Sequence, residues 1–145
     1  MSRQNAREAA VRFLYQCEMT GLSPADAIED YFHNIQPDDE DCYLPMSDKD
    51  IEYLKTLMEG VSNEITVIDD AISKNSKGWK INRISKTLLS IMRVAIYEMI
   101  HVDEVPLKVS LNEAIELAKA YDGDEAGPFI NGVLAGVVKQ YGLCD

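Results

Sequence analysis

The side chains that could catalyse a reaction or hold a metal ion are few and far apart in this chain. Three cysteines and two histidines are the strongest candidates, and no C-x-x-C pair occurs among them. Zinc sites commonly use four cysteine or histidine ligands at close spacings, which these residues do not offer. The G-x-x-x-x-G-K-[ST] loop for nucleotide phosphates and the G-x-S-x-G turn for acyl transfer are also absent. We therefore expect no catalysis and no cofactor; the residues concerned are Cys17, Cys42, Cys144, His33 and His101.

Four consecutive acidic residues, 38–41, are the other group that could attract a cation. They lack the glycine and the distal glutamate of an EF-hand loop. They lie in the segment 35–46, where two prolines argue against a helix or strand. A solvated loop is the simpler interpretation, and we expect no metal site there.

The charges are unevenly distributed along the chain. The net charge of −11 argues against broad nucleic-acid binding, because an acidic surface repels phosphate. However, residues 71–97 carry six basic residues and no acid, whereas residues 21–70 carry 14 acids against two lysines. One interpretation is a basic surface on an otherwise acidic protein. The alternative is an ordinary solvent-exposed face that lacks acids by chance.

A few cationic and aromatic residues have the chemistry that single-stranded RNA requires, namely positive charge for phosphates and flat rings for bases. Arg3 and Arg7 lie one helical turn apart, and a planar guanidinium can contact phosphate with two donors. Phe129 follows the loop 122–128 at the start of a helix, and Tyr15 lies off the apolar stripe of the first helix. The alternatives are a frayed N-terminus for the arginines and ordinary packing for both aromatic residues.

Helical spacing of apolar residues recurs along the whole chain, and strand patterns are almost absent. Gly21 is expected to end the first helix, Ser23 to cap the second before Pro24, and Ser47 to form a capping box with Asp50. These signals predict an all-α protein of about seven helices. The bounds are clearest for the first helix, at about 3–19, the short fourth helix, at about 66–73, and the fifth, at about 85–101.

The segment 85–101 is the most apolar of these helices, with apolar residues over about half of its circumference. Such a broad apolar face belongs in the middle of a helical bundle. At 145 residues, a single domain, 1–145, is expected. The segment 75–80 resembles a joint within it, between helical halves 1–75 and 76–145.

Location can also be inferred from the sequence. A membrane-spanning helix needs about 18 or more consecutive apolar residues, and no such run occurs. The N-terminus has charges and no apolar segment of a secretory signal. The odd number of widely spaced cysteines does not suggest a disulfide framework. We therefore expect a cytoplasmic protein that does not contact membranes.

Three stretches of the chain resemble the NusB family of transcription antitermination factors. The clearest reads V-P-L-K-V-S-L-N-E-A-I-E-L-A-K-A-Y, then an acidic glycine-rich loop, then P-F-I-N-G-V-L, within 105–134. The others are R-V-A-I-Y-E at 93–98 and A-R-E-A-A-V-R-F-L-Y-Q at 6–16. The resemblance implies two small helical bundles packed together in a non-catalytic factor. It further implies binding of boxA RNA with ribosomal protein NusE in an RNA polymerase antitermination complex, chiefly on ribosomal RNA operons.

The resemblance also implies which residues make these contacts. In the family, an arginine-rich start of the first helix and an aromatic residue matching Phe129 contact RNA, and NusE docks around 82–88. The basic segment next to that site would extend the RNA track. Here Gln4 stands where the family tends to carry arginine, and Leu88-Leu89 replaces an acid–base pair. The leucines suit the core, the NusE contact or a homodimer face. The predicted RNA contacts are Arg3, Gln4, Arg7, Tyr15, Lys80, Arg83 and Phe129, and the predicted partner contacts are Asn82, Ile84 and Leu88.

Two other functions stay open at this point. The small number of arginines in the first helix and the net charge of −11 also suit a self-associating regulatory protein that binds little RNA. A NusB-like bundle also occurs as the RNA-binding part of some RNA cytosine methyltransferases, and this chain resembles a stand-alone relative of that part.

Overall fold

The computed structural model describes residues 3–34, 46–78 and 80–144. All regular structure in this part is helical, which confirms the predicted all-α class. The described elements are α1 (Gln4–Thr20), α2 (Pro24–Asn34), α3 (Asp48–Asn63), α4 (Ile65–Asn75), the short 3-10 helix η2 (Ile81–Arg83), α5 (Lys86–His101), α6 (Leu107–Asp122) and α7 (Ala126–Gln140). The predicted acidic loop 38–41 and Cys42 lie outside the described residues.

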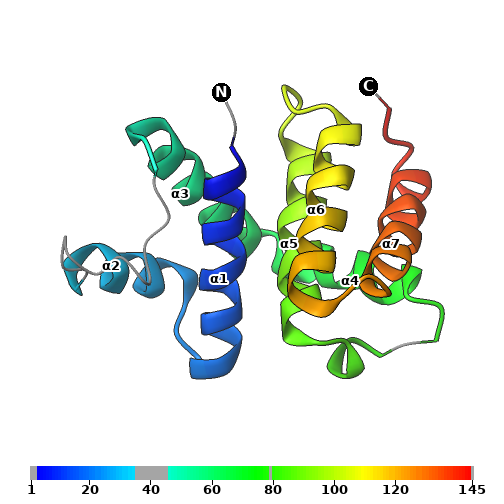
Figure 1. Cartoon of the computed structure of the whole chain (residues 1–145), viewed down its shortest axis with the longest axis horizontal. Helices are drawn as coiled ribbons and strands as arrows, with labels where there is room; N and C mark the ends of the chain where they lie inside the picture. Colours follow the sequence, from blue (N-terminus) through cyan, green and yellow to red (C-terminus); the bar gives the residue numbers. More distant parts are fainter. Residues whose placement is uncertain (1–2, 35–45, 79, 145) are drawn as a thin grey trace.

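The helices form two groups that lie side by side (Figure 1). One group contains α1, α2 and α3, and the other contains α4 to α7. Helix α4 packs chiefly against α5 and α7 and much less against α3. The packing therefore divides the chain between α3 and α4, at Glu64, and not at the predicted joint 75–80. The sequence hides this division because Glu64 is the single residue between the two helices, with neither glycine nor proline beside it.

Helix α5 is the centre of the molecule, as its broad apolar face predicted. It packs against α1, α3, α4, α6 and α7. Leu89, Ile91, Met92 and Ile96 are each at most 1% exposed. Because α1 and α5 join the two groups, the apolar residues of both groups form one continuous core.

The predicted helix ends are confirmed by hydrogen bonds of the capping residues. The Ser47 side chain accepts from the backbone N–H of Asp50, and the Asp50 carboxylate accepts from the backbone N–H of Ser47. The Ser23 hydroxyl accepts from the N–H of Asp26 at the start of α2. Gly21 ends α1 in the left-handed conformation, at φ 81°, which a side chain would strain.

One close approach between helices depends on a glycine. Gly60 of α3 is buried, and a Cβ atom at this position would overlap the Tyr97 ring of α5. We expect Gly60→Ala to lower the free energy of unfolding by about 1–3 kcal/mol, the usual cost of overpacking. Equilibrium denaturation measures this change. Gly132→Ala is the matched control, because an added Cβ at exposed Gly132 meets nothing within 4 Å and removes a helical glycine. The control should be about 0.5–1 kcal/mol more stable than the parent; equal effects at both positions would contradict the prediction.

Candidate nucleic-acid and protein interface

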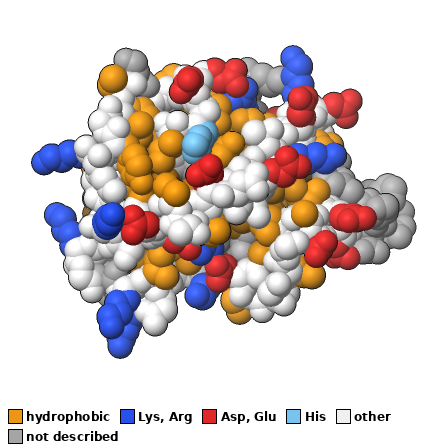
Figure 2. All heavy atoms as spheres, turned by 180° about the vertical axis from the view of Figure 1, so that it is seen from behind, with side chains coloured by type: hydrophobic (Ala, Val, Ile, Leu, Met, Phe, Trp, Pro, Cys, Tyr) orange, Lys and Arg blue, Asp and Glu red, His pale blue; other side chains and the backbone are white. Residues whose placement is uncertain are grey.

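The side of the molecule drawn in Figure 2 does not carry one broad basic face. On the side drawn in Figure 2, acidic and apolar side chains are mixed, and lysines and arginines lie mainly near the margins. Ion pairs explain much of this pattern, because several arginines meet a carboxylate from a distant part of the chain.

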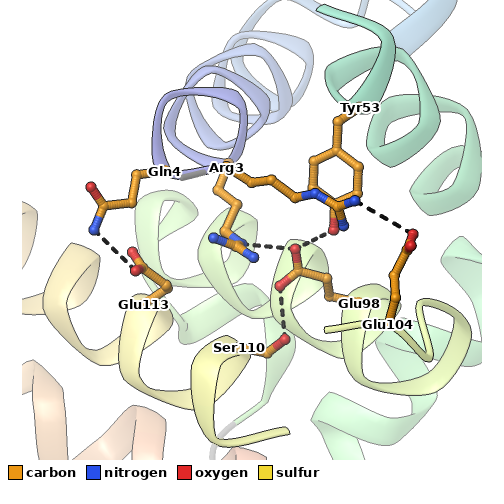
Figure 3. A network of polar contacts seen from close by, with 8 residues as sticks. Arg3, Gln4, Tyr53, Glu98, Glu104, Ser110 and Glu113 are labelled. Atoms are coloured by element: carbon orange, nitrogen blue, oxygen red, sulfur yellow. Dashed lines mark hydrogen bonds and ion pairs between the residues drawn. The ribbon is translucent and has the colours of Figure 1, made fainter. Parts of the chain in front are cut away.

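Arg7 of α1 is buried and pairs with Glu98 of α5, which is labelled in Figure 3. Its Nε donates to Oε2 of Glu98 at 2.7 Å, and the two side chains are 6% and 0% exposed. Glu98 also accepts hydrogen bonds from the Tyr53 hydroxyl and, at 2.8 Å, from the Ser110 hydroxyl. Burial, together with the charge of Glu98, raises the pKa of Tyr53, so Tyr53 stays a donor. The expectation that Arg7 offers its guanidinium to RNA is therefore corrected: Arg7 is an interior residue.

Arg3 and Gln4 are also bonded to carboxylates of the second helical group (Figure 3). Arg3 Nη2 lies 3.4 Å from Glu104 Oε1, and its guanidinium stacks 4.2 Å from the centre of the Tyr53 ring. Gln4 Nε2 donates to Glu113 Oε1 at 3.0 Å. The three residues of the predicted RNA-binding arm thus each meet a carboxylate, and the arm connects the helical groups instead of standing free.

A second buried cation, Arg93, belongs to the acid-free stretch 71–97 and is paired with acids from other helices. Arg93 is 7% exposed, and Nε and Nη2 donate to the two carboxylate oxygens of Asp69 at 2.9 and 2.8 Å. Its Nη1 donates to Glu18, whose other carboxylate oxygen lies 3.8 Å from Lys86 Nζ. Lys74 pairs with Asp70 at 2.9 Å. Three of the six cations in this stretch are therefore paired with acids that lie outside it in the sequence.

The remaining cations of this stretch lie on the segment that leads into α5. Within the part of the chain that the structure describes, no ion pair involves Lys77, Lys80 or Arg83, and all three side chains are exposed. Asn82 is exposed beside them. This segment is therefore the part of the predicted interface where positive charge is available to a ligand.

An apolar groove of about 300 Å³ lies at the start of α5. Its walls come from two segments, the approach to α5 and the junction of α6 with α7. The Ser85 hydroxyl donates to Asp122 at 2.8 Å across this junction and caps α5 by accepting from the N–H of Leu88. The groove is lined by Arg83, Ile84, Ser85, Leu88, Asp122, Glu125, Ala126 and Phe129.

The groove brings together residues that were predicted for different ligands. Leu88 and Phe129 are partly buried against the core and both face this groove. Ile84, predicted as a partner contact, is only 5% exposed, so it belongs mainly to the core at the edge of the groove. Leu89 is 1% exposed, which places it in the core and leaves Leu88 as the leucine of the pair that reaches the groove.

Tyr15 is 41% exposed on α1, so it is not the partly buried packing residue of the alternative interpretation. Helical spacing places it on the same face as Glu8 and Arg12, which both contact the Tyr121 hydroxyl near the end of α6, at 2.8 and 3.1 Å. Met19, one turn further along this face, is 60% exposed. Met19 lies four positions after Tyr15, so the two residues form an exposed apolar pair on this face of α1. The sequence prediction named Tyr15 but not Met19.

No group of three or more histidine, cysteine, aspartate or glutamate side chains is placed to hold a metal ion in the ranges given above. None of the described helices is both long and apolar enough to cross a membrane. Cys17 and Cys144 are free thiols.

Comparison with known proteins connects this geometry to one family. The model of the NusB family matches residues 4–139. The transcription antitermination protein NusB of Ruminiclostridium cellulolyticum is 42% identical over 139 residues, which cover 96% of this chain and 90% of the relative. The same protein from Acetivibrio thermocellus is 43% identical with the same coverage. A solved complex of antitermination factors NusB and NusE with double-stranded RNA contains a chain with a TM-score of 0.78 and 26% identity. That likeness covers 96% of this chain and 97% of the other.

The buried Arg7–Glu98 pair leads to a stability prediction. Glu98→Gln keeps the shape of the side chain but leaves the Arg7 charge uncompensated in the interior. Breaking a buried pair in this way costs about 3–5 kcal/mol. We expect a loss of that size in chemical denaturation. Glu113→Gln, which changes the acceptor of the exposed Gln4 amide, should cost less than about 1 kcal/mol. Similar losses in the two variants would show that burial of the pair is unimportant.

The Arg93–Glu18 contact leads to a pH prediction. The hydrogen bond from Arg93 lowers the pKa of Glu18 below its ordinary value of 4.5. A carboxylate with a lowered pKa stabilises the fold fully above its unfolded-state pKa, and this contribution disappears as the pH falls through the folded-state pKa. We therefore expect Glu18→Gln to be less stable than the parent at pH 7. The difference should shrink below about pH 4.5 in thermal denaturation at several pH values. A difference that stays constant from pH 7 to pH 3 would disprove the assignment.

Proposed function

The chain belongs to the NusB family, and on this premise we propose that it is a transcription antitermination factor that binds boxA-type single-stranded RNA together with ribosomal protein NusE. The prediction that the protein is not an enzyme is confirmed by this membership. The proposal includes action in the cytoplasm, within an RNA polymerase antitermination complex on ribosomal RNA operons.

One observation carries the proposal: residues predicted for the protein partner and for RNA line the same groove. Leu88 and Phe129 offer apolar surface there, and the segment 77–83 leads into it with three exposed cations. A protein partner would cover Leu88 on one side of the groove, and RNA would follow the cations and stack on Phe129 on the other side. In the solved complex of similar fold, NusB, NusE and RNA are assembled together, which supports a joint surface here.

The proposed RNA contacts differ from those predicted for the arm. Arg7 is interior, and Arg3 and Gln4 already contact Glu104 and Glu113. We assign RNA phosphates to Lys80 and Arg83, and stacking to the aromatic residues named for it, Phe129 and Tyr15. Asn82 and Leu88 are assigned to the partner.

The electrostatics explain why RNA and protein would bind together. A net charge of −11 repels RNA as a whole, and Asp122 and Glu125 flank the groove itself. A few cations on one segment therefore give weak affinity for RNA by themselves. A partner bound in the groove holds a second RNA-binding surface close by, so the second contact becomes intramolecular and total affinity rises without a strong single site.

Titration of labelled boxA RNA at two salt concentrations, with and without NusE, tests the RNA part of the proposal. We expect binding to tighten when NusE is present. Lys80→Gln should weaken RNA binding and make the salt dependence shallower by about one unit of slope, because one phosphate contact is lost. Lys139→Gln removes the same charge at an exposed position on α7, away from the groove lining, and should have little effect. Equal effects of the two variants, or no RNA binding at low salt, would refute the assignment.

The partner assignment is tested separately. Leu88→Ala should weaken NusE binding about tenfold in calorimetry, because truncating an apolar anchor commonly costs more than 1 kcal/mol. Val109→Ala is the control, since Val109 is an exposed apolar residue on α6, outside the groove. A change in self-association of Leu88→Ala in sedimentation, with NusE affinity unchanged, would favour a homodimer face instead.

A further inference from the structure

A second, larger cavity lies at the opposite end of α5 from the groove. It has a volume of about 870 Å³, within the size range of ligand sites. One wall is the first part of α3 and the other is the end of α5 with the turn that follows. The cavity therefore lies between the two helical groups, and the groove residues Arg83, Leu88 and Phe129 do not line it.

The charges of this cavity are mainly negative. Its lining contains four carboxylates, Asp50, Glu52, Asp103 and Glu104, and two cations. Asp50 is used in the capping box of α3, and Glu104 pairs with Arg3. The exposed side chains of Glu52 and Asp103 have no hydrogen bond or ion pair with another described residue. Two carboxylates in the cavity are thus available to a ligand.

Aromatic surface accompanies these carboxylates. Tyr97 and His101 both line the cavity, with ring centroids 5.0 Å apart and an angle of 31° between the planes. The space-filling view shows a histidine set among apolar side chains, with carboxylates close by (Figure 2). Aromatic faces attract cations, most often the guanidinium of arginine. The lining therefore combines the two kinds of group that bind a cationic side chain.

The cavity already contains an example of this chemistry. The Arg3 guanidinium stacks 4.2 Å from the centre of the Tyr53 ring while Nη2 lies 3.4 Å from Glu104. Its Nη1 is buried and has no hydrogen-bond partner among the described residues. The cavity thus already holds one guanidinium between an aromatic ring and a carboxylate.

We propose that this cavity is a docking site for an arginine- or lysine-bearing segment of a second protein partner. The site is separate from the groove proposed for NusE and RNA. Charge complementarity decides the class of occupant: four carboxylates against two cations attract a basic peptide and repel RNA phosphates. A protein with such sites at the two ends of α5 would connect a basic partner to the RNA-bound partner.

Binding of a fluorescein-labelled hexa-arginine peptide to the full chain, measured by anisotropy, tests the proposal. The double variant Glu52→Gln, Asp103→Asn should weaken binding at least tenfold. The control double variant Glu59→Gln, Glu116→Gln removes the same charge from exposed positions outside the cavity and should weaken it less than threefold. The comparison separates the site from general attraction to a protein with a net charge of −11.

Further outcomes decide between the possible occupants. Leu88→Ala should leave peptide binding unchanged, so failure of the proposed NusE groove would not affect this test. All four substituted carboxylates are exposed, and thermal melting of each variant checks that the fold is kept. Equal weakening by the two double variants would overturn the proposal. It would also be overturned if the cavity variant weakened binding of single-stranded RNA, because the site would then be a nucleic-acid contact.

Discussion

The buried pair of Arg7 and Glu98 is the constraint on which the arrangement of the two helical groups depends. Neither charge is tolerated alone in the interior, so α1 and α5 must meet in one register. Tyr53 from α3 and Ser110 from α6 supply the remaining donors to the Glu98 carboxylate. Four helices thus meet at one side chain. We interpret this network as the element that selects a single packing of the groups, while apolar burial supplies most of the stability.

The same principle explains why several arginines are not available on the surface as free positive charge. Arg93 is held by Asp69 and Glu18, and Arg3 by Glu104. In each case the acid lies on another element, so an arginine without an acid beside it in the sequence meets one in the fold. Lys77, Lys80 and Arg83, in contrast, are exposed and have no ion pair with another described residue. A small group of exposed cations therefore lies on a protein with a net charge of −11.

Helix α5 gives the molecule two ends with different chemistry. At its start, an apolar groove lies beside exposed cations, and at its end, a larger cavity carries carboxylates and aromatic rings. Both sites are made by residues from separate parts of the chain, and both depend on α5 staying in place within the core. A rigid central helix of this kind suits a protein that acts by holding partners together, because the spacing of the sites does not change.

The sequence by itself determined the all-α class, the helix ends at Gly21, Ser23 and Ser47, the central place of α5 and the family, because these follow from local periodicity, capping chemistry and motif order. It did not determine the division at Glu64, the burial of Ile84 or the position of Leu88 in the groove. Those features arise from contacts between segments far apart in the chain. The same holds for Arg7. The sequence predicts that an arginine on a helix is exposed, but the fold buries Arg7 against a glutamate 91 positions away. Only the tertiary structure decides which charges are paired, because a buried ion pair depends on where two helices lie and not on the residues beside each of them.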